Sequence, residues 1–333
     1  MATTGKPALH HGTRPVAGAA LVLGAASFWA TFGIFAKHLY DAGFAPLELA
    51  SVRAAVGFAG FALLMAPRML LRQPAGAAPP AGGRRGSPVR AMAFFAAYGI
   101  LGYALFTLVF FAALERLDVS IAVALLYTAP AFVMVMSALL WREHVGGVRL
   151  AALVLVLAGV VLVTGAAGTL LGGGPALPPL ALALGVGAGA TYGVYTMFSK
   201  VATHRYGPGA SLFWSFAFAA LAMGIVAPPW APFLRAPEHV GALIALGIVP
   251  TLVPYALYLR GLRELRASTA AMLASVEPVI AALLAAVLLH ERLDALQLAG
   301  MAMVVAAAVV LARQAAAGPA RLMGGLDGRD GPG

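Results

Sequence analysis

The chain has 333 residues and a formal net charge of +10, and 62% of its residues are hydrophobic while only 10% are charged. A soluble domain is about 45–50% apolar and about 25% charged, so this composition indicates a chain that crosses a membrane several times. It contains no cysteine, which excludes disulfides, thiolate metal ligands and cysteine nucleophiles. An excess of Lys and Arg is typical of the cytoplasmic loops of membrane proteins, so no nucleic-acid partner is expected.

Five membrane spans are predicted in the first half of the chain, after a polar cytoplasmic tail at residues 1–15. They lie at about 16–36, 46–66, 91–112, 119–140 and 149–170. The segment 67–90, between the second and third spans, is basic and rich in Pro and Gly, and it is predicted to be a flexible loop of open role.

An uncharged linker at 171–178 leads to five more predicted spans and a Gly-rich tail at 314–333. These spans lie at about 179–200, 209–229, 240–260, 268–289 and 294–313. With the amino terminus inside, 17 of the 22 Lys and Arg residues fall on inner segments and 4 on outer loops, and Arg53 lies within a span. This bias follows the positive-inside rule and predicts that both termini are cytoplasmic.

The two halves repeat each other at an offset of 148 residues. The stretch ALERLDVSIAVALLYTAP, which begins at Ala113, matches GLRELRASTAAMLASVEP, which begins at Gly261, and the match aligns Pro130 with Pro278. Each repeat has an odd number of spans, so the second repeat crosses the membrane in the opposite sense. We therefore expect an all-α polytopic membrane protein of ten transmembrane helices in two inverted five-helix repeats, with a substrate site near the midplane between them.

Only two ionisable side chains are predicted to lie deep in the bilayer, where charges are costly and mark function. Glu277 is nine residues past Ser268, and Arg53 is seven residues past Pro46, which places them about 13 Å and about 10 Å from opposite surfaces. We hypothesise that both face one central cavity, where they pair or share a substrate, and that Glu277 can carry a proton. Alternatively, Arg53 extends to the outer headgroups and Glu277 satisfies backbone groups freed by Pro278.

Helix-breaking residues add to this candidate site, and they include Pro130 and Pro278 within the spans at 119–140 and 268–289. The span at 240–260 contains Pro250 and Pro254, and the corresponding span at 91–112 contains Gly99 and Gly102. Interrupted helices at matching places in two repeats mark the binding sites of many carriers, although they can also be packing kinks.

Four aromatic residues could line an amphipathic pocket that accepts a cation or a ring, although such residues also serve packing: Trp29, Tyr192, Tyr195 and Tyr255. The four-residue spacing of Gly185, Gly189 and Gly193 predicts close helix packing. Glu143 and Glu291 end two spans and are expected to pair with a neighbouring arginine, Arg142, Arg149 or Arg292. Neither a phosphate-binding loop nor a metal motif is present in the sequence, so no cofactor and no metal are expected.

The two five-helix halves, each with a stretch from Pro to Glu (Pro130 to Glu143 and Pro278 to Glu291), resemble the two EamA domains of the drug/metabolite transporter superfamily. The resemblance covers residues 16–170 and 179–313. It implies a multi-pass carrier of the bacterial inner membrane, commonly an exporter of amino acids or other small metabolites. The expected partners are a small-molecule substrate and the lipid bilayer. Whether a proton or a second copy of the chain also takes part is an open question at this point.

We therefore expect a secondary transporter that exports a small amphipathic metabolite, an amino acid or a drug-like compound, by alternating access. One alternative is a lipid-handling flippase, which requires a groove open sideways to lipid beside the spans at 91–112 and 240–260. A membrane-embedded enzyme is the other alternative, but it would need a cluster of His, Asp or Glu at one depth, so an enzyme is not expected.

Overall fold

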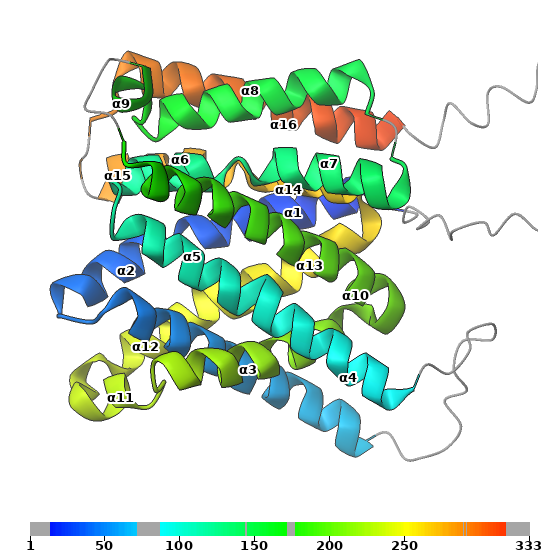
Figure 1. Ribbon diagram of the computed structural model, residues 1–333, viewed down its shortest axis with the longest axis vertical. Coiled ribbons are helices and arrows are strands. Elements are labelled where there is room, and N and C mark those ends of the chain that lie inside the picture. The colour runs from blue at the N-terminus through cyan, green and yellow to red at the C-terminus, as the bar shows by residue number, and fades with distance from the viewer. Residues whose placement is uncertain are drawn as a thin grey trace, which may run out of the picture.

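The computed structural model describes residues 14–71, 87–143, 145–171, 177–288, 290 and 292–317, and this part of the chain is helical throughout, without strands (Figure 1). Eight helices in it are long and apolar enough to cross a membrane, and Gly147–Val163 is a shorter apolar helix. The prediction of an all-α polytopic membrane protein is confirmed to this extent.

The first half contains four candidate spans, three of them interrupted. The helices are α1 (Pro15–Ala30) and α2 (Phe32–Asp41); α3 (Pro46–Leu71); α4 (Pro88–Ala97), the π-helical η1 (Tyr98–Ala104) and α5 (Leu105–Leu114); α6 (Val119–Leu126) and α7 (Ala129–Trp141); then α8 (Gly147–Val163) and the short α9 (Ala167–Leu171). Pro46 opens α3 as expected, because proline is favoured in the first helical turn.

The second half contains the other four candidate spans. Its elements are α10 (Pro179–Val226); α11 (Ala231–Arg235), η2 (Pro237–His239), α12 (Val240–Gly247), the π-helical η3 (Ile248–Leu252) and α13 (Val253–Glu264); α14 (Ala267–Ala274) and α15 (Glu277–Leu288); and α16 (Ala295–Ala317).

Two of the predicted spans differ from the structure. The helix α10 continues past residue 200 and covers two predicted spans, with a single break at Gly207, whose φ is +80° and ψ 160°. Glycine adopts this φ without strain, and the following Pro208 forces an extended ψ on it. The predicted span at 149–170 ends early, since α8 stops at Val163 and the chain turns at Gly165, whose φ is +74°.

Both ends of the predicted loop and the start of the predicted tail at 314–333 are also helical: residues 67–71 in α3, 88–90 in α4 and 314–317 in α16. The remaining parts of the predicted tails, loop and linker, at 1–13, 72–86, 172–176 and 318–333, lie outside the described residues.

The helices pack in pairs that join distant parts of the sequence. The pair α8 and α16 lies together at the top of Figure 1, while α1 packs against α13 and α7 against α14. The first part of α10 packs against η1 and α5, and the second part packs against α3 through ring contacts of Phe58 with Phe213 and of Phe61 with Phe216.

Glycines set how close some of these helices come. A Cβ on Gly159 of α8 would lie 2.8 Å from the Gly300 carbonyl oxygen of α16. In α10, a Cβ on Gly185, Gly189 or Gly193 would lie 2.3–2.5 Å from side-chain atoms of Leu125, Thr128 or Met136. The predicted packing role of this glycine ridge is confirmed.

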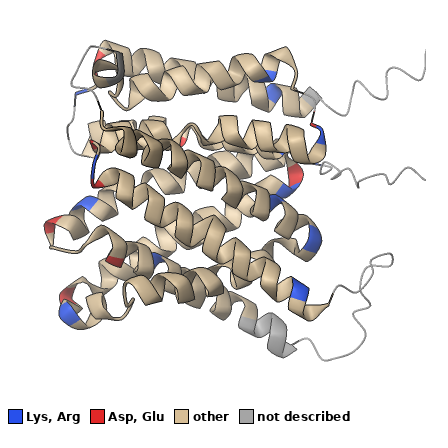
Figure 2. Ribbon diagram, in the orientation of Figure 1, with Lys and Arg blue, Asp and Glu red and all other residues tan. Residues whose placement is uncertain are grey.

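Charged residues gather toward the two ends of the bundle, and the middle is largely uncharged (Figure 2). We call the end where α1 begins and α16 ends the terminal end, and the end with α2, α9 and α11 the opposite end (Figure 1). The chain crosses between these two ends in each candidate span, so the functional groups in the middle of the bundle are held by helices on every side.

Candidate functional site

The two halves carry π-helical segments at corresponding positions. The offset of 148 residues maps Tyr98–Ala104 onto residues 246–252, which contain the second segment, Ile248–Leu252. Short π-helical segments are rare and frequently mark functional sites. Pro250 lies within the second segment, and Pro254 is the second residue of α13, directly after it. The interruption predicted from these residues is present in both halves.

A second pair of interruptions lies at the next matching place. The chain turns at Tyr127–Thr128 between α6 and α7, and 148 residues later at Ser275–Val276 between α14 and α15. Pro130 and Pro278 are each the second residue of the helix that follows. Proline suits this position because its missing N–H would have no helical partner there.

Arg53 of α3 is half-buried and directed at the π-helical segment η3. Its Nε donates to the Thr251 hydroxyl at 2.9 Å, and its Nη2 lies 3.4 Å from the Pro250 carbonyl oxygen. Its guanidinium also lies 4.4 Å from the centre of the Phe32 ring. The Thr251 hydroxyl in turn donates to the Leu246 carbonyl at 3.0 Å. Arg53 therefore contacts protein groups around η3, which differs from a side chain that extends to the headgroups.

Glu277 is the first residue of α15, at the turn that separates it from α14. The Tyr127 hydroxyl, from the matching turn in the first half, is a hydrogen-bonding neighbour of its carboxylate, and the charge of Arg53 acts on the same group. A carboxylate at a helix N-terminus is stabilised by the helix dipole. The ion pairs among the described residues do not include one between Glu277 and Arg53.

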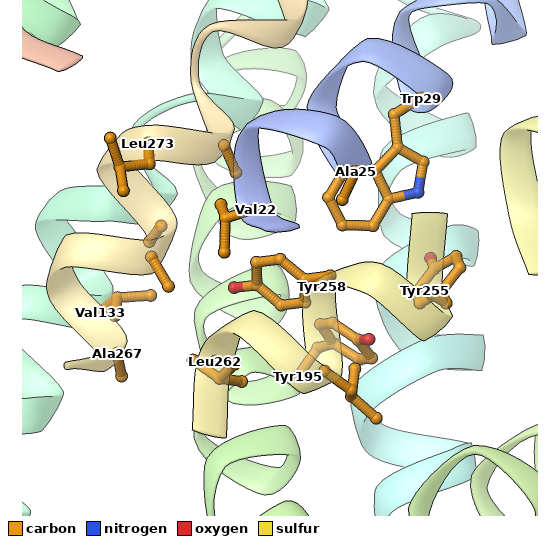
Figure 3. Close-up of a cluster of buried hydrophobic side chains, with 14 of the residues drawn as sticks. Val22, Ala25, Trp29, Val133, Tyr195, Tyr255, Tyr258, Leu262, Ala267 and Leu273 are labelled. Carbon is orange, nitrogen blue, oxygen red and sulfur yellow. The ribbon is translucent and has the colours of Figure 1, made fainter. Parts of the chain in front are cut away.

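A cluster of aromatic side chains lies between these two charges. Tyr255 of α13 is its centre, with ring centroids 5.3 Å from Trp29, 5.8 Å from Tyr195, 5.1 Å from Phe216 and 6.0 Å from Tyr103. We call these five residues, with Tyr192 and Tyr258, the aromatic cluster. Figure 3 shows Trp29 over Tyr258 and Tyr255, with Tyr195 beside them.

The four aromatic residues predicted from the sequence all belong to this cluster, because Tyr192 contacts Tyr195 at 5.7 Å. The hydroxyl of Tyr255 lies in the fields of both Arg53 and Glu277. The six candidate site residues therefore come together in one region of the bundle, on α1, α3, α10, α13 and α15.

Two hydroxyls in the cluster, those of Tyr195 and Tyr258, are buried and make no hydrogen bond of standard length and angle with the described residues, although the Ser199 hydroxyl lies near the first and the Thr196 hydroxyl near the second. A buried polar group left without a partner costs about 1–3 kcal/mol. The hydroxyl of Tyr98, which is also buried, is by contrast 2.7 Å from the Ser199 hydroxyl. The unpaired hydroxyls are groups that a polar ligand or a water molecule can satisfy.

A cavity of about 510 Å³ opens at the terminal end of the bundle, between α1 and α13 on one side and α3 and the second part of α10 on the other. Its deepest lining includes Phe61, whose ring is 5.2 Å from that of Phe216. The cavity therefore ends against the aromatic cluster.

Polar contacts join the two halves at the terminal end. The Ser268 hydroxyl donates to Glu143 at 3.2 Å, and Arg149 pairs with Glu143 at 4.0 Å, which confirms the predicted arginine partner. The buried Lys200 donates to the carbonyl of Leu262 at 2.7 Å and to that of Leu265. Glu291 lies outside the described residues.

A bidentate ion pair joins the halves at the opposite end. Arg235 donates to both carboxylate oxygens of Glu48, at 2.8 and 2.9 Å, and its guanidinium lies 5.1 Å from the Phe44 ring. Hydrogen bonds to Glu48 raise the pKa of the Arg235 guanidinium above its usual value, so this pair is charged at physiological pH. The rings of His38 and His239 are also in contact here, at 5.7 Å.

Sequence reasoning missed several members of the site. Tyr258 follows Tyr255 by three residues, a spacing that places both on one helix face and could have identified it. Thr251, Phe216 and Tyr127 carry no such signal, because their roles depend on which helices are neighbours. Within the described residues, no group of three or more His, Asp or Glu side chains could hold a metal ion.

The comparisons with known proteins agree with this arrangement. A model of the EamA-like transporter family matches residues 16–165 and again residues 179–313. An uncharacterized transporter of Archaeoglobus fulgidus is 31% identical over 221 residues, which cover 65% of this chain and 76% of that protein. A protein of known crystal structure shares the fold, with a TM-score of 0.68 at 22% identity over 89% of this chain and 98% of that one. This chain belongs to the EamA-like transporter family, within the drug/metabolite transporter superfamily.

Proposed function

We propose that this transporter exports a small amphipathic metabolite, an amino acid or a drug-like compound, across the bacterial inner membrane by alternating access. The observation that carries the proposal is the aromatic cluster between Arg53 and Glu277, where helices from both halves are interrupted at matching positions. Such a region offers rings for an apolar body and two opposite charges for polar ends.

Ten spans in two inverted repeats are the arrangement that explains the helix pairs. If α10 is divided at Gly207 and α8 is counted as a span, each half has five spans, at residues 16–170 and 179–313. Exchange of the two halves, span for span, then turns the pair α1–α13 into the pair of the first part of α10 with α5. It leaves the pair α8–α16 unchanged. This is the pattern expected of a pseudo-two-fold axis in the membrane plane.

The terminal end is proposed to be cytoplasmic. Described arginines and a lysine gather there, on the segments around Arg142, Lys200, Arg205, Arg260, Arg263, Arg266 and Arg313, whereas Lys37, Arg116, Arg235 and Arg292 lie on the segments of the opposite end. The positive-inside rule then places both termini in the cytoplasm.

The polar contacts at the two ends are proposed to act as gates. The Glu143–Ser268 contact closes the cytoplasmic end, and the Glu48–Arg235 pair closes the outer end. Each contact joins the first half of the chain to the second, so each must break when its end opens. The exposed Glu48–Arg235 pair contributes only about 0–1 kcal/mol, which allows the outer end to open readily.

Glu277 is proposed to couple export to the proton gradient, with exchange of substrates as the other driving force. Its carboxylate is placed where it can bind either a proton or a cationic group of the substrate, next to Tyr127 and in the field of Arg53. The substrate's anionic or polar end would lie toward Arg53, and its apolar body would lie against the rings of Trp29 and Tyr255.

A metabolite comparison tests this proposal and identifies the cargo. Spent medium and cytosol would be compared among cells that lack the protein, cells that overproduce it and cells that overproduce Glu277→Gln. We expect at least one small amphipathic compound to accumulate in the medium only with the unaltered protein. The proposal is wrong if the three extracellular profiles are the same although the protein is in the membrane.

A further inference from the structure

The cavity at the terminal end has a lining whose polarity changes with depth. Three arginines line its outer part. Arg14 directly precedes α1, and Arg260 and Arg263 lie in the last two turns of α13. Apolar side chains line the part closer to the middle of the membrane, among them Leu21, Phe61 and Leu212.

The lining of the cavity therefore becomes less polar with depth along the helix axes. Leu21 is seven residues past Arg14, or about 10 Å deeper, and Ala256 is four residues before Arg260, or about 6 Å deeper. The α3 wall includes Leu64, whose side chain is 58% exposed on the surface of the bundle. The apolar part of the lining therefore includes a side chain that is also exposed on the side of the bundle.

The charges of the lining do not cancel. Glu264 is the single carboxylate among the described lining residues, and its Oε2 accepts a hydrogen bond from the backbone N–H of Arg14 at 3.1 Å. The side chains of Arg260 and Arg263, three residues apart, are on neighbouring positions of the α13 surface and are exposed. Three guanidinium groups against one carboxylate make this mouth attractive to an anion.

We propose that this cavity binds an anionic phospholipid of the cytoplasmic leaflet. The phosphate lies among Arg14, Arg260 and Arg263, and an acyl chain follows the apolar wall from Met65 and Leu64 toward Phe61. A lipid fits better than a soluble inorganic anion, because a lipid uses both the cationic mouth and the apolar wall that reaches the side of the bundle at Leu64. The groove required of a flippase would lie beside both the span at 91–112 and the span at 240–260, and the described lining of this cavity includes Ala256 and Arg260 of the second span but no residue of the first.

The test uses the full-length protein in detergent micelles that contain equal mole fractions of phosphatidylglycerol and phosphatidylcholine. Native mass spectrometry counts the lipids that stay bound when the protein is released from the micelles. We expect preferential retention of phosphatidylglycerol, and about 30-fold weaker binding by the double variant Arg260→Gln/Arg263→Gln, since each basic residue near the surface adds about fivefold. If the double variant does not fold, either single variant can replace it, with an expected loss of about fivefold in phosphatidylglycerol binding.

The matched control is Arg142→Gln/Arg313→Gln, which removes two exposed arginines from the same end of the bundle but outside the cavity. It is expected to retain phosphatidylglycerol like the unaltered protein. Equal losses in the two double variants would overturn the proposal, since the attraction would then be a general surface effect. Displacement of the lipid by inorganic phosphate at equal concentration would also overturn it, because the cavity would then bind a small anion.

Discussion

The guanidinium of Arg53 on α3 donates to the hydroxyl of Thr251, 198 residues later in the π-helical segment η3, with 2.9 Å between Nε and Oγ1. The same guanidinium lies near the carbonyl of Pro250, which the interrupted helix leaves available. In a bilayer, an irregular backbone is tolerated only where protein or a cavity satisfies its polar groups. Arg53 therefore holds the interruption open and stays beside the aromatic cluster.

Replacement of Arg53 by Gln is expected to abolish export and to lower stability by about 2 kcal/mol, the usual value for a hydrogen bond to a charged group. Arg53→Lys keeps the charge but lacks the planar guanidinium that reaches both Thr251 and Pro250. We therefore expect a stability between those of the unaltered protein and Arg53→Gln, and little transport. Thermal unfolding and export of the identified substrate would be measured. Arg116→Gln, at the exposed surface, is the control. Normal export by Arg53→Gln would contradict the assigned role.

Replacement of Glu277 by Gln keeps the size and hydrogen-bonding capacity of the side chain but removes the proton-binding carboxylate. We expect the variant to fold and to lose the dependence of export on external pH. Glu115→Gln, whose side chain is 66% exposed, should transport normally. The measurement is the export rate over a pH series in both variants. A pH dependence that Glu277→Gln leaves intact would remove this residue from proton coupling.

The ring and the hydroxyl of Tyr255 are expected to contribute differently. Tyr255→Ala removes a ring that contacts four other aromatic rings, so a loss of about 3–5 kcal/mol in stability and loss of transport are expected. Tyr255→Phe keeps the packing and should fold normally with weaker substrate binding. The apparent affinity for substrate and the unfolding temperature would be measured together. Equal transport by both variants would show that the ring has no role in binding.

Many of these elements could be predicted from single residues. Pro250 and Pro254 indicated an interruption that the structure has as η3, and the matching glycines indicated η1. Pro130 and Pro278, aligned by the offset of 148 residues, were predicted as helix-breaking residues within spans, and in the structure each is the second residue of a helix that follows a turn. These features are local, because proline and glycine change the backbone wherever they stand.

Other features could not be predicted because they depend on tertiary neighbours. The contact of Arg53 with Thr251 requires that α3 lies against η3, and a single sequence does not indicate which helices pack together. The break between the two parts of α10 was placed too early, since the apolar pattern fades at Lys200 although the helix continues to Gly207. Lys200 stays in the helix because its buried amine donates to the carbonyls at the end of α13.

Close packing of α8 against α16 predicts a large difference between two glycines of the same helix. A Cβ on Gly159 would lie 2.8 Å from the Gly300 carbonyl oxygen, whereas a Cβ on Gly147 has nothing within 4 Å. Gly159→Ala should therefore lower stability by about 1–3 kcal/mol. Gly147→Ala should leave it unchanged or raise it by up to about 1 kcal/mol. Unfolding temperatures of the two variants in one detergent check this, and equal values would contradict the close approach.

Loss of the outer gate should favour the outward-open state. Glu48→Gln weakens the bidentate pair with Arg235 and is expected to leave folding intact, because such exposed pairs contribute little to stability. We expect groups in the central region to be labelled faster by a reagent that is added on the outer side of the membrane. Glu238→Gln, which alters a carboxylate on the same surface, is the control. Unchanged labelling in Glu48→Gln would show that the pair is not a gate.

The central claim is that the aromatic cluster is reached alternately from the two sides of the membrane. The chain has no cysteine, so Thr196→Cys introduces a single thiol next to the Tyr258 hydroxyl, at a position that is fully buried in this structure. Ala307→Cys, buried in α16, is the control that should not react.

The most direct measurement is labelling of Thr196→Cys by a membrane-impermeant thiol reagent in right-side-out and in inside-out vesicles. Our account predicts slow labelling in both orientations, protection by the identified substrate in both, and no labelling of Ala307→Cys. Labelling in neither orientation, or in one orientation only, would contradict it.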